Sequence, residues 1–582
     1  MRLFFKKMPK RFWLFLSGAL LGMTVIFAKL GILAYFALIP AGIIWFQKLN
    51  NCKYRVKSAY LDGFVFYMSF DLVCFHWLLY FYPLEFLDFT KAEALSVILL
   101  GWVGLSFLQS VFSAFVFVLA RWLSNTDFCR SYPVAVPFCI AALFAVNEWT
   151  QTLTWAGVPW ARIAISQTEL PALMQSASLF GSYGISFIVV AVNMLLAFAF
   201  VNVDKKRLAA LTALGVFLVN AIFGTAMYFI PFVDMEESVT IAAVQGNFES
   251  QSTQNIPVSE KYAVYEAQTV KAAEAGADIV IWPETVIYIA TDIKFFYKGA
   301  YRSLSERAGE LAKECGVTLI VGNFIEDFSD TYNCVSVFYP NGEQERGAYS
   351  KTKLVPFGEY VPMRELITSL FPILGEINML GTDISAGGGY SPFDSVKDGD
   401  SFKIGALICF DSIYESTAIS TVAEGAQALV ISSNDSWFYD SRALYMHHSQ
   451  NILRAVEMGR YTVNCGNTGV TSIISDKGEI KEIMPIYEQG FILGVVYPSN
   501  HVTLYSIIGN TPIYFLIFCI LILLIWDMIN SKFLKKDTDA RVLFYIRLNT
   551  AQTSKKHSTP CIAFKIKYLL KESPKPSQRD MI

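Results

Sequence analysis

Residues 405–412 read GALICFDS, an apolar run that ends in a cysteine, an aromatic residue and an acid. A thiol at the end of a buried strand is either an inert core side chain or a nucleophile, because buried cysteines behave as small apolar residues unless their surroundings activate them. These eight residues leave both interpretations of Cys409 open, so the rest of the chain has to decide between them.

Two more reactive side chains follow strand-like runs in the same part of the chain. Glu284 follows ADIVIWP, and Lys351 lies in the loop-like segment GAYSKTKLVPFGEYVP after an interrupted strand pattern. A thiol, a carboxylate and an ammonium group can perform acyl chemistry. The thiol attacks a carbonyl, the carboxylate takes the thiol proton, and the ammonium and the N–H of Phe410 stabilise the oxyanion. A nearby cation is also expected to lower the pKa of the thiol.

Each of these residues also fits a structural role when it is considered alone. Glu284 follows a proline and suits the first turn of a helix, where the helix dipole favours an acid. Lys351 and Lys353 suit a solvated loop. The argument for a reactive site therefore rests on finding all three groups at strand ends of one domain.

The elements that must position these groups begin near residue 237, where short β-branched or fully apolar runs alternate with amphipathic helices. Strands that are apolar throughout are buried on both faces, which predicts a layered α/β domain. Reactive residues in such folds gather beyond the carboxyl ends of the strands. The predicted strands are 238–247, 277–285, 317–324, 334–340, 402–410, 428–435 and 461–469, and the predicted helices are 259–276, 304–315 and 444–458.

The composition of the whole chain indicates a membrane protein. Of the 582 residues, 54% are hydrophobic and only 16% are charged, whereas about 25% are charged in an average soluble chain. A membrane-spanning helix needs about 20 mainly apolar residues. The predicted spans are 12–28, 30–47, 59–82, 95–120, 133–149, 176–202, 208–230 and 507–529.

Basic residues orient these spans, because Lys and Arg accumulate in short cytoplasmic loops. They cluster before the first predicted span and after the second, fourth and sixth, whereas the loops near 81–94 and 150–170 contain few of them. The pattern predicts cytoplasmic termini and an exported domain. The predicted division is a membrane domain of about seven helices at 1–232, a periplasmic domain at 233–505, a last span at 506–530 and a basic cytoplasmic tail at 531–582.

The sequence gives no sign of a cofactor or a metal ion. It contains no glycine-rich phosphate loop and no zinc-type spacing of His and Cys. His447 and His448 are adjacent, so they point to different sides of a helix or strand and make a poor pair of ligands. The net charge of −2 gives no indication of nucleic acid binding. A Cys315–Cys334 disulfide and free core thiols both remain open.

Several motifs together resemble the nitrilase superfamily and, within it, the apolipoprotein N-acyltransferases of the bacterial inner membrane. The resemblance extends to about residue 530 and implies a four-layer αββα fold for the exported domain. The superfamily motifs are WPE at 282–284, Y-x-K-x-x-L at 349–354 and ICFD at 408–411, and the membrane branch adds VQGN at 244–247, KLVPFGEYVP at 353–362, NDSWF at 434–438 and GVPW at 157–160.

The resemblance implies a role for each matching residue. Glu284 corresponds to the general base, Lys351 to the oxyanion-stabilising lysine, and Cys409 to the nucleophile that holds the acyl group as a thioester. Glu359 matches a further glutamate of the site. Phe410 and Asp411 stand where the family usually has Tyr and Glu, and they are expected to support the substrate or the oxyanion.

The implied reaction has two substrates and no cofactor. The sn-1 acyl chain of a membrane phospholipid is transferred through the cysteine to the α-amine of an apolipoprotein's diacylglyceryl-cysteine, by an enzyme expected to be a monomer. A membrane-anchored amidase using the same residues on a small C–N substrate is the nearest alternative. A transporter or receptor is the alternative from another class, with Asp62, Asp71 and His76 as its few ionisable candidates near a span.

The sequence also departs from the family in places. Besides Phe410 and Asp411, residues 251–257 lack the tryptophan usual after VQGN. Near the last span, TLYSIIGN at 503–510 has Ile507 and Asn510 in place of a charged pair. These differences leave the three reactive residues unchanged and bear on substrate preference and on the level of activity. FPILGEINML at 371–380 is expected to act as an interfacial lid.

Overall fold

The computed structural model describes residues 8–51, 53–84, 89–233, 238–249, 256–285, 287, 290, 292–327, 330–370, 383–397 and 400–530. The chain up to Ile520 forms one compact unit. The predicted tail at 531–582, the predicted lid at 371–380 and residues 251–255 lie outside the described residues.

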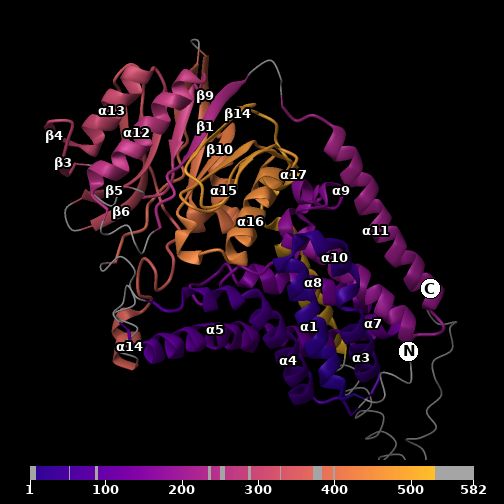
Figure 1. Cartoon of the computed structure of the whole chain (residues 1–582). Helices are drawn as coiled ribbons and strands as arrows, with labels where there is room; N and C mark the ends of the chain where they lie inside the picture. The colour runs from indigo at the N-terminus through magenta and orange to yellow at the C-terminus, as the bar shows by residue number, and fades with distance from the viewer. Residues whose placement is uncertain are drawn as a thin grey trace, which may run out of the picture. The chain divides into compact units, whose positions relative to one another are not determined.

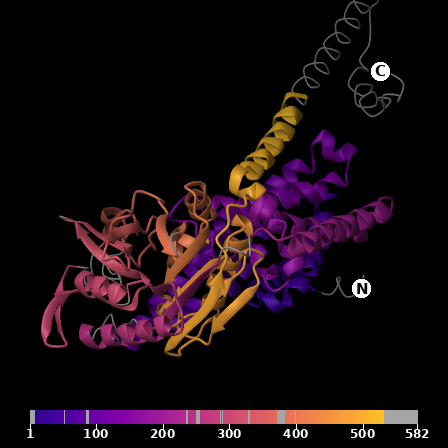
Figure 2. The ribbon, with the colours of Figure 1, turned by 90° about the horizontal axis from the view of Figure 1, so that it is seen from above.

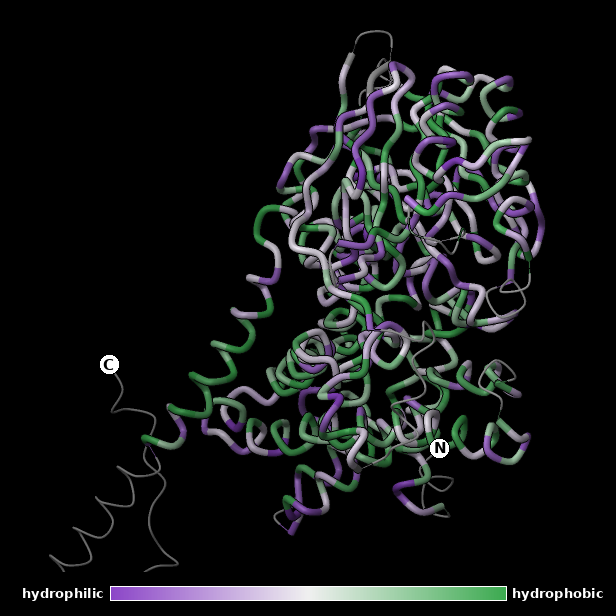
Figure 3. The backbone as a smooth tube through the Cα atoms, turned by 90° about the vertical axis from the view of Figure 1, so that its left-hand side faces the viewer, coloured by the Kyte–Doolittle hydropathy of each residue, from purple (hydrophilic) through white to green (hydrophobic). Residues whose placement is uncertain are grey.

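Helices make up the first part of the chain (Figure 1), and most of their residues are hydrophobic (Figure 3). Short 3-10 segments join them at η1 (Ala28–Leu33), η2 (His76–Phe81) and η4 (Ile163–Gln167). The helices are α1 (Lys10–Ile26), α2 (Ala34–Ala37), α3 (Ile39–Leu49), α4 (Val56–Cys74), α5 (Lys91–Ser113), α6 (Phe115–Leu123), α7 (Asp127–Ser131), α8 (Ala135–Thr150), α9 (Pro171–Met174), α10 (Ala177–Val201) and α11 (Lys206–Phe229).

Five helical segments of the described chain are long and apolar enough to cross a membrane: Ala28–Leu49, Lys91–Leu123, Ala177–Val201, Lys206–Phe229 and Thr511–Asn530. Helix α11 exposes large apolar side chains, among them Leu211, Val219 and Ile222, as a lipid-facing helix would. The remaining predicted spans coincide with α1, α4 and α8. Helices α1 and α8 have 17 and 16 residues, or about 25 Å at 1.5 Å per residue, against about 30 Å of hydrocarbon. Eight crossings therefore stay a prediction.

The ionisable groups near the third predicted span have partners inside the protein. Asp62 accepts hydrogen bonds from Arg11 at 3.0 Å, from Lys48 at 2.5 Å and from Tyr54 at 2.9 Å. Asp71 accepts one from Ser110 at 3.0 Å. Such pairing is the ordinary way to place a carboxylate among apolar helices, so these contacts hold the helices together.

Two six-stranded sheets form the domain that follows (Figures 1 and 2). The first has the order β14-β1-β2-β5-β6-β7 and the second β13-β12-β11-β10-β9-β8. Strands β1, β2 and β5 are parallel, as are β9, β10 and β11. The bounds are β1 (Val239–Gln245), β2 (Ile279–Trp282), β5 (Thr318–Asp327), β6 (Asp330–Phe338), β7 (Gln344–Ser350), β8 (Phe393–Lys397), β9 (Asp400–Ile408), β10 (Ala428–Ser433), β11 (Thr462–Gly466), β12 (Thr471–Ile474), β13 (Ile480–Met484) and β14 (Gly490–Val496), with a separate hairpin of β3 (Lys294–Tyr297) and β4 (Ala300–Ser303).

The alternation of side chains along the strands explains the layers. Ile279 and Ile281 pack between the two sheets, whereas Val280 and Trp282 point the other way, toward α12 (Val258–Glu274) and α13 (Leu304–Cys315). On the second sheet, Leu407 faces α15 (Glu415–Ala423) and α16 (Arg442–Met458). The order is helix, sheet, sheet, helix, so the predicted αββα fold beside a helical membrane domain is confirmed. The chain then continues through α17 (Leu504–Ile508) to the helix at Thr511–Asn530.

Candidate active site

The ammonium group of Lys351, at the end of one strand, lies between a carboxylate at the end of a second strand and a carboxylate in the loop that follows the lysine. Its Nζ is 2.9 Å from Oε1 of Glu284 and 2.9 Å from Oε1 of Glu359. Lys351 follows the last residue of β7, and Glu284 comes two residues after β2. Burial alone would lower the pKa of Lys351, but the two carboxylates outweigh it and raise the pKa well above its ordinary value. The lysine is therefore a fixed positive charge.

Two asparagines that the sequence analysis did not single out complete this cluster. The side-chain amide of Asn333, on β6, donates to Glu284 at 2.7 Å and to Glu359 at 3.2 Å. The backbone N–H of Asn434, just after β10, donates to Oε2 of Glu284 at 2.8 Å. No local pattern in TYNCVSVF marks Asn333, because its role depends on strand pairing, whereas Asn434 opens the quoted motif NDSWF.

The turn at Glu284 needs a glycine on the neighbouring strand. A Cβ atom at Gly322 of β5 would lie 2.3 Å from the carbonyl oxygen of Pro283 and 2.8 Å from Cα of Glu284. A side chain at this position would push the WPE turn away from Lys351. Gly322 therefore allows the close approach that places the carboxylate.

Cys409 is the first residue beyond β9 and has an unusual backbone conformation. Its φ is +46°, a region that costs a residue with a side chain about 1–3 kcal/mol and is concentrated at functional sites. The residue as a whole is half-buried. Its electrostatic surroundings include Glu284, Lys351, Asp435 and Glu359, so the structure brings the three residues singled out from the sequence into one cluster.

The expectation of a lowered thiol pKa is wrong in its net direction. Burial and the carboxylate of Glu284 raise the pKa of Cys409 well above its ordinary value, although Lys351 acts in the opposite sense. The sequence suggested the cation but not the excess of carboxylates around it. The resting thiol is therefore protonated, and attack by sulfur needs a base at the moment of reaction.

Asp411 organises the loop that contains Lys351. Oδ1 accepts hydrogen bonds from the backbone N–H groups of Thr352 and Lys353 at 3.2 and 2.7 Å and from the Thr352 hydroxyl at 3.0 Å. Oδ2 accepts from the Tyr349 hydroxyl at 2.7 Å and from the Ile408 N–H at 3.2 Å. The carboxylate is fully buried, so these contacts give it a positioning role between the lysine loop and the cysteine turn.

We expect Asp411→Asn to destabilise the protein by about 1–3 kcal/mol, because an amide N–H₂ would then face the N–H of Ile408 or of Lys353. The formation of any acyl adduct on Cys409 should also slow, since Lys351 loses its anchor. Thermal unfolding in detergent and intact-mass kinetics measure the two effects. Asp394→Asn, an exposed acid on β8, is the matched control. Equal stability of the two variants would contradict the positioning role.

Phe410 and Glu359 are the remaining predicted site residues. Phe410 is buried with its ring 5.5 Å from Tyr414. Oε2 of Glu359 accepts a hydrogen bond from the N–H of Val355 at 2.8 Å, which closes the PFGE loop around Lys351. Phe357 within this loop has φ +64°, so the loop is held in a conformation that Glu359 helps to maintain.

A second polar cluster lies behind Cys409, and the sequence analysis missed it. His447 of α16 approaches both Asp435 oxygens through Nδ1, at 2.9 and 3.0 Å, and Asp435 lies 3.8 Å from the Cys409 sulfur. The sequence analysis had set the histidine pair aside. Indeed, His448 points elsewhere, to Ser472 at 2.8 Å, but His447 by itself reaches the turn at Cys409.

Aromatic side chains connect the membrane helices to this region. The Trp160 ring of the GVPW motif lies 5.7 Å from His447 and 5.3 Å from Phe438, and Trp77 of η2 lies 5.0 Å from Phe438. Gln450 of α16 also donates to the carbonyl oxygen of Pro159 at 3.1 Å. The GVPW loop therefore packs directly on the helix that contains His447.

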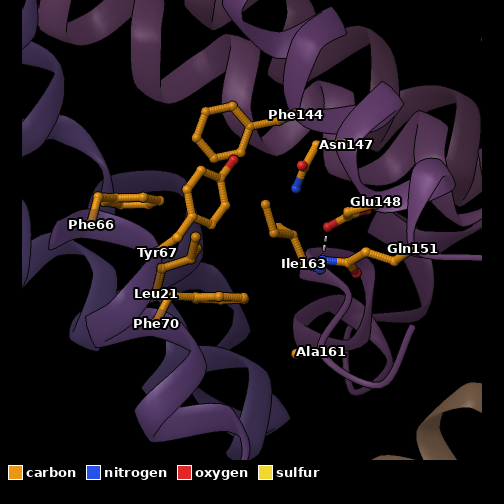
Figure 4. A pocket seen from close by; sticks show the side chains of 10 residues that line it. All are labelled: Leu21, Phe66, Tyr67, Phe70, Phe144, Asn147, Glu148, Gln151, Ala161 and Ile163. Carbon is orange, nitrogen blue, oxygen red and sulfur yellow. Dashed lines mark hydrogen bonds between the residues drawn. The ribbon is translucent and has the colours of Figure 1, made fainter. Parts of the chain in front are cut away.

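A small pocket lies among the membrane helices, apart from the candidate catalytic residues (Figure 4). Its polar side comes from Asn147, Glu148 and Gln151, and Glu148 accepts a hydrogen bond from the N–H of Ile163 at 2.8 Å. Its apolar side consists of Leu21, Phe66, Tyr67, Phe70, Phe144, Ala161 and Ile163. None of the strand-end residues lines it.

The sequence left open the state of the thiols of Cys315 and Cys334 and the effect of Ile507 and Asn510. Cys315 and Cys334 are free thiols, so the structure has no disulfide between them. Ile507 on α17 is exposed, and Asn510 accepts a hydrogen bond from Tyr505 at 2.9 Å. Neither departure from the family pattern removes a contact of Lys351, Glu284 or Glu359.

The fold and the strand-end cluster define a class of protein, the carbon–nitrogen hydrolases of the nitrilase type. A family model described as "Carbon-nitrogen hydrolase" matches residues 240–499, which span both sheets. Among solved structures, the chain is similar to Nit3 of Saccharomyces cerevisiae, a member of branch 10 of the nitrilase superfamily. That match has 16% identity and a TM-score of 0.33, covering 49% of this chain and 97% of that one.

The membrane domain narrows the class to one family. Residues 17–195 match a model described as "Apolipoprotein N-acyltransferase N-terminal domain". The chain is 28% identical over 525 residues to an apolipoprotein N-acyltransferase of Geobacter metallireducens, covering 87% of this chain and 93% of that protein. A relative of the same name from Methylococcus capsulatus is 28% identical over 411 residues, covering 70% and 77%. Over most of its length, the chain is thus similar to the apolipoprotein N-acyltransferases.

Proposed function

We propose that this protein performs the final acylation of bacterial lipoproteins, through a thioester on Cys409. The acyl donor is a membrane phospholipid, and the acceptor is the α-amine of an apolipoprotein's N-terminal diacylglyceryl-cysteine. The observation that supports the mechanism best is the charge cluster beside the cysteine turn, with Lys351 held 2.9 Å from both Glu284 and Glu359.

In the first step, Glu284 takes the thiol proton as the Cys409 sulfur attacks the sn-1 ester carbonyl. A carboxylate has about four lone-pair sites, so the three hydrogen bonds from Lys351, Asn333 and Asn434 leave capacity for this proton. The Lys351 ammonium and the Phe410 N–H stabilise the oxyanion. The ester C–O bond then breaks, and the leaving alkoxide takes the proton from Glu284 and departs as lysophospholipid.

In the second step, the lipoprotein amine attacks the thioester carbonyl. Glu284 accepts a proton from the attacking nitrogen, the C–S bond breaks, and the cysteine thiolate regains a proton as the amide forms. The same base and the same oxyanion donors serve both steps, which makes the scheme ping-pong. Glu359 assists by holding Lys351 in place.

Contacts among the membrane helices support the predicted orientation. Arg11, Lys48 and Tyr54 all bond to Asp62, and Arg121 donates to the carbonyl oxygen of Tyr54 at 2.7 Å. The start of α1, the end of α3 with the loop after it, and the end of α6 therefore meet at one end of the bundle. Of the segments that contact the catalytic domain, GVPW lies in the loop at 150–170 that is predicted to face the periplasm, and η2 lies at the end of the third predicted span that leads to the loop near 81–94. We propose an inner-membrane protein with cytoplasmic termini and a periplasmic catalytic domain that acts as a monomer.

The experiment that tests the function uses the full-length protein in detergent with a phospholipid and a diacylated lipopeptide. Intact-mass analysis should detect one fatty-acyl adduct on the native protein, none on Cys409→Ala, and loss of the adduct when the lipopeptide is added. Triacylated peptide should appear at the same time. If neither adduct nor triacylated peptide forms, the proposed transfer is wrong. Nothing in the described structure or among the relatives favours the amidase alternative. If the same sample hydrolysed small amides, that alternative would be supported instead.

A further inference from the structure

Three potential metal ligands converge at the nucleophile turn from separate elements. They are Sγ of Cys409 after β9, the carboxylate of Asp435 in η8 (Asp435–Phe438) after β10, and His447 of α16. Their donor atoms all lie within 4.8 Å of one another. Asp435 and His447 are buried, and Cys409 is half-buried as a residue, so the cysteine is the most accessible of the three.

The hydrogen bonds of His447 prepare its Nδ1 atom for a ligand. Nε2 lies 3.2 Å from the carbonyl oxygen of Cys409 and 2.9 Å from Oγ of Ser412. The hydroxyl of Ser412 lies 2.9 Å from that same carbonyl. In the tautomer whose ring proton is on Nε2, that proton is donated to the carbonyl or to Ser412, and Nδ1 is free to bind an ion. A backbone carbonyl that accepts from the far nitrogen is the usual support of a metal-binding histidine.

The charge around the sulfur favours a cation. The one ammonium group, of Lys351, is outnumbered by the carboxylates of Glu284, Glu359 and Asp435, which all act on Cys409. Nδ1 of His447 and Oδ1 of Asp435 also face each other at 2.9 Å. Because both are acceptors once Nε2 holds the ring proton, either a proton or a metal ion must lie between them.

We propose that Cys409, Asp435 and His447 form a three-ligand site for a divalent metal ion of the zinc class, which reversibly blocks the nucleophile. Thiolate, imidazole and carboxylate are all zinc ligands, and bonds of about 2.0–2.3 Å place tetrahedral ligand atoms roughly 3.3–3.8 Å apart. The Sγ–Oδ1 distance of 3.8 Å matches this, and the Nδ1–Oδ1 pair opens by a small rotation. Water takes the fourth position.

Binding releases the thiol proton and the proton held between imidazole and carboxylate, because the ligands bind metal only when deprotonated. The metal is an inhibitor and not a cofactor, since the sulfur it occupies is the atom that must attack the ester. Metal binding and acylation of Cys409 are thus mutually exclusive, a consequence that rests on the proposed function. The metal site itself does not depend on the proposed function.

Cobalt(II) is a direct probe, because a cobalt–thiolate bond gives an intense near-ultraviolet charge-transfer band. Titration of the full-length protein in detergent with Co²⁺ should produce this band with a stoichiometry of one, and Zn²⁺ should displace it. The band should be absent in Cys409→Ala. The affinity should fall by at least about tenfold in His447→Gln and in Asp435→Asn.

His448→Gln is the matched control, since His448 is the adjacent, equally buried imidazole and bonds to Ser472 instead. It should bind Co²⁺ as the native protein does. No saturable band in the native protein would overturn the proposal. So would a band of unchanged affinity in both His447→Gln and Asp435→Asn, because the cysteine would then bind metal without the other two ligands. Using two isosteric variants keeps the test decisive if one of them fails to fold.

A second readout needs no acyl-transfer activity. Zn²⁺ should slow alkylation of Cys409 by iodoacetamide by at least about tenfold, and a chelator should restore the native rate. In His447→Gln the protection should largely disappear. If Zn²⁺ leaves the alkylation rate of the native protein unchanged, the metal does not occupy the sulfur. Absence of an acyl adduct in metal-free protein would instead count against the proposed function alone.

Discussion

Lys351→Met should abolish measurable acyl-enzyme formation, with a loss of at least about 10³-fold in the rate of adduct appearance, or about 4 kcal/mol. The side chain is the only ammonium group in contact with Glu284 and Glu359 among the described residues. Without it, the oxyanion loses its charged donor. One of the two carboxylates should also take up a proton, because like charges so close cannot both stay ionised, and Glu284 then no longer serves fully as a base.

The same substitution should reduce stability by about 3–5 kcal/mol, the usual result of removing one partner of a buried ion pair. Adding Glu359→Gln in the Lys351→Met background should recover part of this loss, since it removes the competing negative charge. A double-mutant cycle by thermal or denaturant unfolding in detergent measures the coupling.

Lys353→Met is the control for the neighbouring position. Lys353 extends over the Tyr414 ring at 5.3 Å, and its side chain has no contact with Glu284 or Glu359 among the interactions described. Its adduct rate should stay within about tenfold of the native rate, an effect of roughly 1.4 kcal/mol. A Lys351→Met protein that still forms the adduct at the native rate would contradict the oxyanion role.

Glu415→Gln should destabilise the protein by about 3–5 kcal/mol, because it removes the centre of a buried ionic network. Glu415, at the start of α15, lies 2.7 Å from Arg162 and 3.6 Å from Arg454. Its other carboxylate oxygen accepts a short hydrogen bond from Tyr183. Arg162 precedes η4 and Tyr183 lies on α10, so the network joins the membrane helices to the catalytic domain.

The effect of Glu415→Gln should depend on pH. Burial by itself would raise the pKa of Glu415, but Arg162 and Arg454 outweigh it and lower the pKa below its ordinary value of 4.5. A depressed folded-state pKa gives stability that is complete above the unfolded pKa and is lost as the pH falls through the folded value. The difference in melting temperature between native and variant should therefore be constant near neutrality and shrink below about pH 4.5.

Glu424→Gln, an exposed acid just after the same helix, provides the comparison. It should change the melting temperature by less than the scatter between preparations, since exposed single charges contribute little. If Glu415→Gln behaves like Glu424→Gln, the network does not hold the two domains together.

Much of the catalytic domain could be predicted because its strands are apolar on both faces. Ile241 and Ala243 pack between the sheets while Ala242 and Val244 contact the helical layer, and only a strand covered on both sides needs such a run. Strands β13 and β12 escaped prediction for the opposite reason. Residues 480–483 of β13 are exposed, and β12 has only four residues, so neither has a period-two or continuous apolar pattern.

The number of helices able to span the membrane was harder to predict than their positions. A window of apolar residues identifies α1, α4 and α8 as helices, but their usable length depends on where neighbouring helices and polar partners end them. Helix α4 stops at Cys74 and gives way to the 3-10 segment η2, whereas the predicted span ran on to residue 82.

By itself, the sequence determined the chemical types available and the strand ends at which they lie. Glu284, Lys351 and Cys409 follow apolar runs, and a chain that buries those runs must place the three residues near the edges of its sheets. It also determined the division into apolar helices and a layered α/β domain, because composition and periodicity are local properties.

Only the tertiary structure decided which other groups meet the cysteine and with what balance of charge. The backbone N–H of Asn434 bonds to Glu284 across 150 residues of sequence, and His447 lies beside Cys409 across 38. Such pairings arise from the register of packed sheets and helices, which no local spacing records. That is why the sequence suggested a cation that lowers the thiol pKa, while the folded site, with its burial and excess carboxylates, raises it.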